Sequence, residues 1–168
     1  ILGMGIPVPP RNIFPSNIQG LPTWYEMRIS DKGHMGAREG VDLMVAMNPQ
    51  TWDRDVAELA PGGYLFYDST KMLPRSRFRD DVTVLGLPLT EICTREYTDP
   101  RQRQLMKNIL YVGALTALLD MDFTVVEGLI AHQFRGKDKL IASNVQALKL
   151  GYDEAKATLP CPIGLRVE

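Results

Sequence analysis

Apolar runs and apolar periodicities in the middle of the chain predict an alternating order of strands and helices. The segment 41–47 is apolar at nearly every position, and the segments 64–67 and 82–87 have the same character. Such runs are typical of parallel strands that are covered on both faces. Apolar residues recur at helical spacing in 51–60, 90–97, 100–119, 122–134 and 138–159. This order predicts an α/β protein built in layers.

An alternating pattern near the N-terminus predicts a different kind of strand. In the segment 23–30, one face carries Trp24, Glu26 and Arg28, and the other carries Tyr25, Met27 and Ile29. This is the pattern of a half-exposed strand at a sheet edge or in an antiparallel pair. A shorter strand is expected at 6–8, where the following prolines end it.

Capping signals and apolar spacing predict where the later helices begin and what they bury. Asp99 followed by Pro100 is a start signal, because the carboxylate accepts hydrogen bonds from free N–H groups and proline suits the first helical position. We expect this helix to be largely buried, with Met106, Ile109, Leu110 and Val112 out of solvent. Asp122 is expected to start the next helix, with Val125, Val126, Leu129, Ile130 and Phe134 facing inward.

The elements together define the expected fold class. The first eight residues have the pattern of a helix end, a stop at Gly5 and a short strand. An α/β protein would place another strand and helix before them. The sequence therefore predicts a three-layer α/β/α fold with a mostly parallel, mixed sheet, Rossmann-like and lacking its first strand–helix unit.

Composition narrows the function classes. The chain has 168 residues, 45% hydrophobic and 23% charged, which are ordinary values for one globular domain. A net charge of −1 gives no reason to expect nucleic acid, and the longest apolar run, 109–119, is too short to cross a bilayer. The two cysteines, Cys93 and Cys161, lack the spacing of a metal site. We expect a cytoplasmic protein without disulfide, metal ion or membrane segment.

Polar residues at the expected carboxyl ends of the strands define the candidate binding site, because ligands of open α/β sheets bind there. These ends are 48–51, 68–71 and 88–91. We expect the neutral loop 16–20 to form part of the same rim. The resulting rim of amides, hydroxyls and one lysine suits a polar or phosphorylated ligand. Its candidate binding residues are Ser16, Asn17, Gln19, Gly20 and Lys71. In the alternative interpretation the loop is an ordered turn whose amides bond their own backbone.

The search for catalytic residues finds none. The chain contains no nucleophile elbow, phosphate-binding loop or paired-histidine zinc motif. Both histidines are expected to be surface or structural residues, and Cys93 a small core residue. Arg75, Arg77 and Arg79 are expected to form a solvated face, with the binding of an acidic partner as the alternative.

Three parts of the sequence form long and specific motifs. They are residues 12–26, residues 41–48 with 51–52, and residues 61–63 with 67–70. These motifs resemble the gamma domain of 2-oxoacid:ferredoxin oxidoreductases. The similarity covers nearly the whole chain and points to the version at the N-terminus of the large subunit in the two-subunit, 2-oxoglutarate type.

The resemblance implies a role within a larger enzyme. Such enzymes oxidatively decarboxylate a 2-oxoacid to its acyl-CoA with thiamine diphosphate and Mg, and pass electrons through an iron–sulfur cluster to ferredoxin. The gamma domain holds neither thiamine diphosphate nor cluster. It packs on other domains of its subunit and on the thiamine-binding partner subunit, and is implicated in contacting CoA. Residues 1–159 would form this domain, 160–168 an exit segment toward a following domain, and the isolated chain would be inactive.

One departure and two alternatives accompany this resemblance. Pyruvate-type relatives carry lysines in the loop that corresponds to 16–20, where this chain has Asn17 and Gln19. The loop therefore offers amides where those relatives offer positive charge to CoA. The chain could instead be a self-sufficient nucleotide-binding domain, which needs a glycine-rich phosphate loop, or a domain that only docks subunits.

Overall fold

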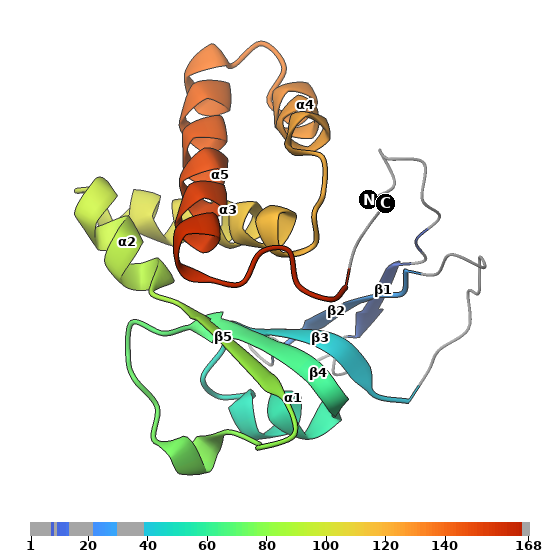
Figure 1. Ribbon diagram of the computed structural model, residues 1–168. Coiled ribbons are helices and arrows are strands. Elements are labelled where there is room, and N and C mark those ends of the chain that lie inside the picture. Colours follow the sequence, from blue (N-terminus) through green and yellow to red (C-terminus); the bar gives the residue numbers. More distant parts are fainter. Residues whose placement is uncertain (1–7, 9, 14–21, 30–38, 166–168) are drawn as a thin grey trace.

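The computed structural model describes residues 8, 10–13, 22–29 and 39–165, and its main body has three layers (Figure 1). The central layer is a parallel sheet in the order β3 (Val41–Ala46), β4 (Leu59–Asp68), β5 (Thr83–Leu87). Helix α1 (Trp52–Glu58) covers one face. Helices α3 (Pro100–Leu118) and α5 (Asp138–Thr158) cover the other. The layered α/β class is confirmed.

Three shorter elements complete the main body. They are the 3-10 helix η2 (Arg75–Arg77), helix α2 (Leu89–Glu96) and helix α4 (Phe123–Gln133). The two helix starts that were predicted from a capping aspartate, at Asp99 and Asp122, are confirmed. The Asp99 side chain accepts hydrogen bonds from the N–H groups of Arg101 and Gln102, and the Asp122 side chain accepts one from that of Thr124. These bonds satisfy N–H groups that a helix cannot pair internally.

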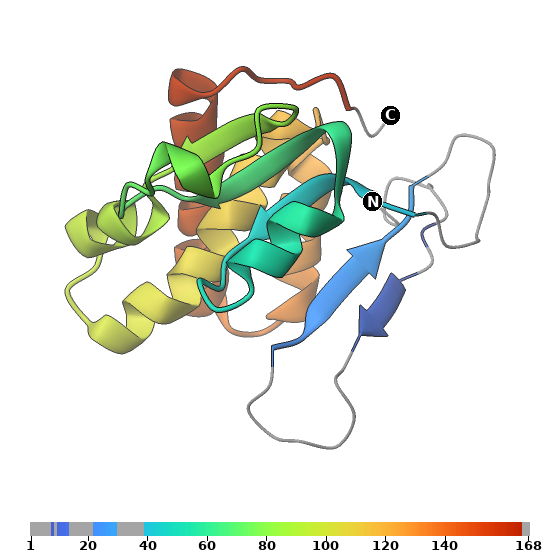
Figure 2. The same ribbon diagram turned by 90° about the horizontal axis from the view of Figure 1, so that it is seen from below.

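A two-stranded antiparallel ribbon is separate from the main sheet (Figure 2). Strand β1 (Pro10–Ile13) pairs with β2 (Trp24–Met27), so the predicted antiparallel strand is confirmed. Strand β1 was not predicted. The strand expected at 6–8 lies, apart from Val8, outside the described residues.

Strand β4 begins earlier than the sequence indicated. The sequence patterns predicted a helix over 51–60 and a strand over 64–67, which leaves residues 61–63 as the connection between them. In the structure Leu59 already pairs with Val41, and the register then shifts. Gly62 has a φ of +78°, and a Cβ on Gly63 would lie only 2.9 Å from the Ala60 carbonyl oxygen. Glycine therefore permits an irregular strand start that looks like a helix end in sequence.

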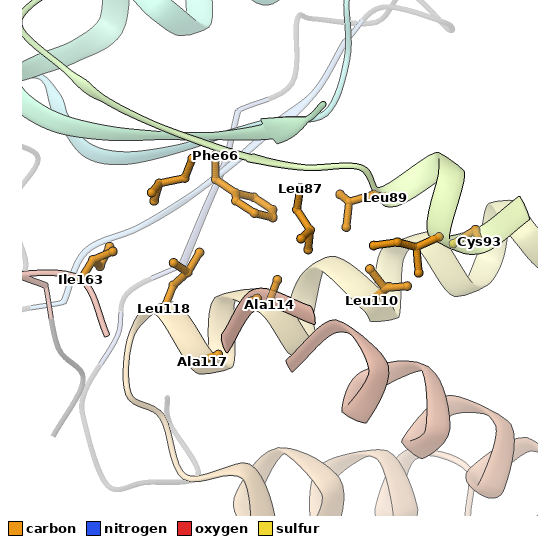
Figure 3. Close-up of a cluster of buried hydrophobic side chains, with 12 residues drawn as sticks. Phe66, Leu87, Leu89, Cys93, Leu110, Ala114, Ala117, Leu118 and Ile163 are labelled. Carbon is orange, nitrogen blue, oxygen red and sulfur yellow. The ribbon is translucent and has the colours of Figure 1, made fainter. Parts of the chain in front are cut away.

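The larger hydrophobic core lies between the sheet and helices α3 and α5 (Figure 3). Phe66, Leu87 and Leu89 project from the sheet side toward Leu110, Ala114 and Leu118 of α3. Ile163, in the irregular segment after α5, joins the same core, and its N–H donates to the Leu118 carbonyl oxygen at 2.8 Å. Residues 160–164, part of the predicted exit segment, form neither helix nor strand. The exit toward a following domain stays a prediction.

The predicted buried faces of two helices need correction. In α3, Met106 and Leu110 are buried as expected, but Ile109 and Val112 are only half-buried. In α4, Leu129 is 50% exposed, so its inward assignment is wrong. Both helices are apolar on most sides. The packing against the sheet and α5 determines which side of α3 is buried, and the packing against α5 determines this for α4; local sequence reveals neither.

Candidate functional site

The best-defined polar cluster of the described chain centres on Asp68, at the carboxyl end of β4. Its Oδ1 accepts hydrogen bonds from the Thr70 hydroxyl at 2.7 Å, the Thr70 N–H at 3.2 Å and the Thr90 N–H at 3.3 Å. Its Oδ2 accepts a short hydrogen bond from the Thr90 hydroxyl and lies 3.7 Å from Lys107 Nζ. The sheet thus brings together two of the three predicted strand ends.

This cluster caps helix α2 from outside the helix. The residue before α2, Pro88, has no side-chain cap of its own. Instead Asp68 accepts from the Thr90 N–H, and the Thr70 hydroxyl accepts from the Glu91 N–H at 3.0 Å. The first N–H groups of a helix favour an anion. Here the carboxylate of Asp68 already occupies the position that an external anion would take.

The environment of Asp68 holds it ionised. Burial alone would raise its pKa, but hydrogen bonds from Thr90 and Thr70 outweigh burial and lower the pKa below its ordinary value. The Lys107 ammonium group supplies a positive charge beside the Oδ2 of Asp68. A carboxylate held in this way is a poor general base, because its affinity for a proton is reduced. The cluster therefore stabilises the local structure and is not suited to proton transfer.

A small hollow of about 70 Å³ adjoins this cluster between α2 and α3. It is lined by Thr90, Cys93, Thr94, Pro100, Arg103, Gln104 and Lys107. Burial raises the pKa of the Cys93 thiol, which therefore stays protonated and unreactive. Cys93 packs in the core as predicted. Sites for cofactors usually measure about 300–1,000 Å³, so this hollow is too small for a nucleotide.

The structure reaches only part of the predicted binding rim. Ser16, Asn17, Gln19 and Gly20 lie outside the described residues. Lys71 is described and is exposed, directly after the turn that Asp68 and Thr70 fix. The sequence analysis did not predict that Lys107 contributes a positive charge to the cluster around Asp68. It comes from a helix far along the chain, and nothing in its neighbours signals a partner at the sheet edge.

A second polar group, also missed from the sequence, ties the ribbon to α1. Asp55 is only 3% exposed, and its carboxylate accepts from Trp24 Nε1 at 2.7 Å and from the Thr51 hydroxyl at 2.6 Å. The Arg54 guanidinium lies 4.0 Å from the centre of the Trp24 ring. A buried carboxylate needs such donors. The ribbon therefore has a defined position against α1.

The arginines after β4 are largely compensated by aspartates. The ion pairs are Arg75–Asp80, Arg77–Asp53 and Arg79–Asp81. The arrangement favours a solvated face and offers little to an acidic partner. Within the described ranges, no three His, Cys, Asp or Glu side chains are placed to hold a metal ion. No helix there is long and apolar enough to cross a membrane.

Comparisons with known proteins give the class of this chain. A family model described as pyruvate ferredoxin/flavodoxin oxidoreductase matches residues 1–154. Since that match takes in most of the 168 residues, the chain belongs to this family.

Curated relatives resemble the chain over part of their own length. The ketoisovalerate oxidoreductase subunit VorA of Methanothermobacter thermautotrophicus is 29% identical over 118 residues, which are 70% of this chain and 24% of that protein. The 2-oxoglutarate synthase subunit KorC of Archaeoglobus fulgidus is 26% identical over 113 residues, 67% of this chain and 52% of that protein. The chain spans about a quarter of the VorA relatives that it matches.

Two solved structures share the fold. The 2-oxoglutarate:ferredoxin oxidoreductase from Magnetococcus marinus, with 2-oxoglutarate, coenzyme A and succinyl-CoA bound, has a TM-score of 0.81 and 23% identity. The match covers 97% of this chain and 28% of that chain. The gamma subunit of a keto/oxoacid ferredoxin oxidoreductase from Geobacter sulfurreducens has a TM-score of 0.68 and 20% identity. That match covers 94% of this chain and 85% of the gamma subunit. The gamma-type α/β fold is thereby confirmed.

Proposed function

We propose that the chain is a non-catalytic module of a 2-oxoacid:ferredoxin oxidoreductase that works in the cytoplasm. The whole enzyme would oxidatively decarboxylate a 2-oxoacid to its acyl-CoA and reduce ferredoxin. The observation that carries the proposal is the family match over residues 1–154. Relatives are named for both ketoisovalerate and 2-oxoglutarate. We take 2-oxoglutarate as the first substrate to test, because the resemblance of the sequence is to that type.

The cysteine content of the chain and its described residues do not fit the cofactors of such an enzyme. An iron–sulfur cluster is typically held by four cysteine thiolates, and the chain has two cysteines. Of these, Cys93 is buried in the core. The Mg that accompanies thiamine diphosphate needs oxygen ligands, and the described part of the chain has no group of three acidic or metal-binding side chains arranged for it. Other parts of the enzyme would therefore hold both cofactors.

The proposal gives this module a contact with CoA. Asn17 and Gln19 would donate hydrogen bonds from the loop, and Lys71 would be the nearest cation. The exposed position of Lys71 after a turn fixed by Asp68 and Thr70 supports this assignment. Because the turn already fixes the backbone beside Lys71, less conformational entropy is lost when this lysine pairs with a phosphate.

The two alternatives make different predictions for CoA. A self-sufficient nucleotide-binding domain would bind a nucleotide without partners, and the small volume of the hollow beside α2 disfavours such a role for that site. A domain that only docks subunits would leave the CoA dependence of the assembled enzyme unchanged when its loop is altered.

The experiment is an assay of the isolated chain with 2-oxoglutarate, ketoisovalerate or pyruvate, together with CoA and a viologen acceptor. We expect no turnover above the buffer rate. Turnover by the chain alone would exclude a non-catalytic role. Binding of a nucleotide by the chain alone, measured by calorimetry, would favour the first alternative.

A further inference from the structure

The hollow between α2 and α3 carries more positive charge than its surroundings compensate. Helix α2 packs beside the first turns of α3 (Figure 1). Two cations, Arg103 and Lys107, line the hollow, and none of its described lining residues is a carboxylate. Asp68, next to the hollow, lies 3.7 Å from Lys107 Nζ and compensates one of the two charges. The charge of Arg103 has no such compensation.

The Arg103 guanidinium is fixed at one nitrogen and available at the other two. Its Nε donates to the carbonyl oxygen of Tyr97 at 2.7 Å, just after the end of α2. In the part of the chain that the structure describes, its two terminal nitrogens have no hydrogen-bond partner and form no ion pair. Several other arginines do pair with carboxylates, namely Arg54, Arg75, Arg77, Arg79 and Arg95. A guanidinium oriented in this way presents a planar pair of donors that matches the oxygens of a phosphate.

The two cations repel each other across one turn of α3. Arg103 and Lys107 are four residues apart, so they lie on the same side of the helix. Like charges at this spacing destabilise a helix. Arg103 is half-buried and the Lys107 side chain is only 21% exposed, so solvent ions screen this repulsion less than at a fully exposed site. An anion in the hollow would replace the repulsion by two attractions.

Neutral polar groups line the hollow from both helices. Gln104 of α3 has a carboxamide without a hydrogen-bond partner among the described residues. On α2, the Thr94 hydroxyl donates to the Thr90 carbonyl oxygen at 2.8 Å, and its own oxygen can still accept. Donors on one side and an acceptor on the other suit a tetrahedral anion that keeps one proton, as hydrogen phosphate does.

The helix N-termini beside the hollow do not supply this charge. At α2 the Asp68 carboxylate accepts from the Thr90 N–H, and at α3 the Asp99 carboxylate accepts from the N–H groups of Arg101 and Gln102. These N–H groups are therefore occupied. The positive charge facing the hollow comes from side chains, which substitution can remove without changing either cap.

We propose that this hollow binds a phosphate group. The terminal nitrogens of Arg103 and the carboxamide of Gln104 donate to it, and Lys107 supplies the second positive charge. A volume of about 70 Å³ leaves no room for a base or a sugar. The ligand is therefore inorganic phosphate or the terminal phosphate of a molecule whose remainder lies outside the hollow. The inference does not depend on the proposed function, because binding requires no turnover.

The first test measures the binding of inorganic phosphate to the protein complex that contains this chain, by calorimetry at low ionic strength. Arg103→Gln removes the charge, and Arg101→Gln is the matched control, since Arg101 is exposed on the same helix and does not line the hollow. Hydrogen bonds to charged groups are the stronger ones, so Arg103→Gln should weaken binding at least about tenfold. The control should bind as the wild type does. No binding by the wild type, or equal binding by the two variants, overturns the inference and leaves the proposed function intact.

A variant that keeps the charge separates loss of the site from loss of the fold. Arg103→Lys should bind phosphate more tightly than Arg103→Gln and less tightly than the wild type, because it keeps the charge and loses the paired donors. Circular dichroism checks that each variant is folded. Binding by Arg103→Lys no tighter than by Arg103→Gln would show that charge at this position does not hold the anion, and would overturn the inference.

A second measurement identifies the source of the phosphate group, and this part rests on the proposed function. The KM of the assembled enzyme for CoA is measured with and without added inorganic phosphate. An increase in the control Arg101→Gln that is absent in Arg103→Gln would assign the hollow to a phosphate of CoA. An unchanged KM, with phosphate bound in the first test, would assign the hollow to inorganic phosphate.

Discussion

The crossing of α3 and α5 gives the sharpest prediction for stability. A Cβ added to Gly151 of α5 would lie 1.9 Å from the carbonyl oxygen and 2.7 Å from the carbonyl carbon of Leu110 in α3. The reciprocal relation holds for Gly113 of α3, where an added Cβ would lie 2.0 Å from the Leu148 carbonyl oxygen. Both obstacles are backbone atoms, so no side chain can rotate to make room. The two helices would have to move apart.

The expected loss follows from two opposing effects of Gly151→Ala. Overpacking in a dense core costs about 1–3 kcal/mol and occasionally more, and a contact of 1.9 Å against backbone belongs at the upper end. Replacing glycine by alanine in a helix contributes about 1 kcal/mol in the other direction. We therefore expect a net loss of about 2 kcal/mol or more in the free energy of unfolding.

Urea unfolding followed by circular dichroism measures this loss, and Gly128→Ala is the matched control. Gly128 lies inside α4 and is exposed, and a Cβ added to it would meet no atom within 4 Å. Its replacement should stabilise the protein by up to about 1 kcal/mol. If Gly151→Ala is as stable as Gly128→Ala, the helices do not cross as described and the reasoning is refuted.

Three further predictions concern the core, the polar cluster and the loop. Leu110→Ala should cost about 2–5 kcal/mol in urea unfolding because the side chain is fully buried, whereas a similar loss for exposed Leu105→Ala would contradict the assigned face of α3. The folded-state pKa of Asp68 is lowered, so its stabilising effect is present above the unfolded value of about 3.9 and is lost as pH falls through the folded value. In the Asp68→Asn variant the free energy of unfolding should therefore fall less steeply toward acid pH. The same steep fall as in the wild type would contradict this. Changing Asn17 and Gln19 together to alanine should raise the KM of the assembled enzyme for CoA about five- to hundredfold, with the CoA-independent decarboxylation step unaffected; an unchanged KM would leave the loop without a CoA role.

Elements with strong local signals could be predicted from the sequence. The capping carboxylates Asp99 and Asp122 mark helix starts because the stabilising hydrogen bonds are made within two or three residues. The run 41–47 indicated a strand, observed as Val41–Ala46, because burial on both faces leaves few polar positions. The alternation at 23–30 indicated the two faces of β2 in the same way.

Features that depend on distant residues could not be predicted. Asp68 caps a helix that begins 21 residues later, and Trp24 reaches Asp55 across 31 positions. Strand β1 contains proline and asparagine, which are depleted in strands, and it exists through its pairing with β2. For the candidate site, the sequence indicated the strand ends, but the structure shows that Asp68 and Thr70 bond within the protein and leave Lys71 exposed.

The most direct test of the proposed function follows this chain into its natural assembly. The protein complex that carries the chain is isolated by an affinity tag on the chain and assayed for 2-oxoacid- and CoA-dependent reduction of a viologen. We predict that this complex contains thiamine diphosphate and turns over, with the acyl-CoA as product, while the chain alone does not. A tagged complex without thiamine diphosphate and without 2-oxoacid oxidation would contradict the proposed function.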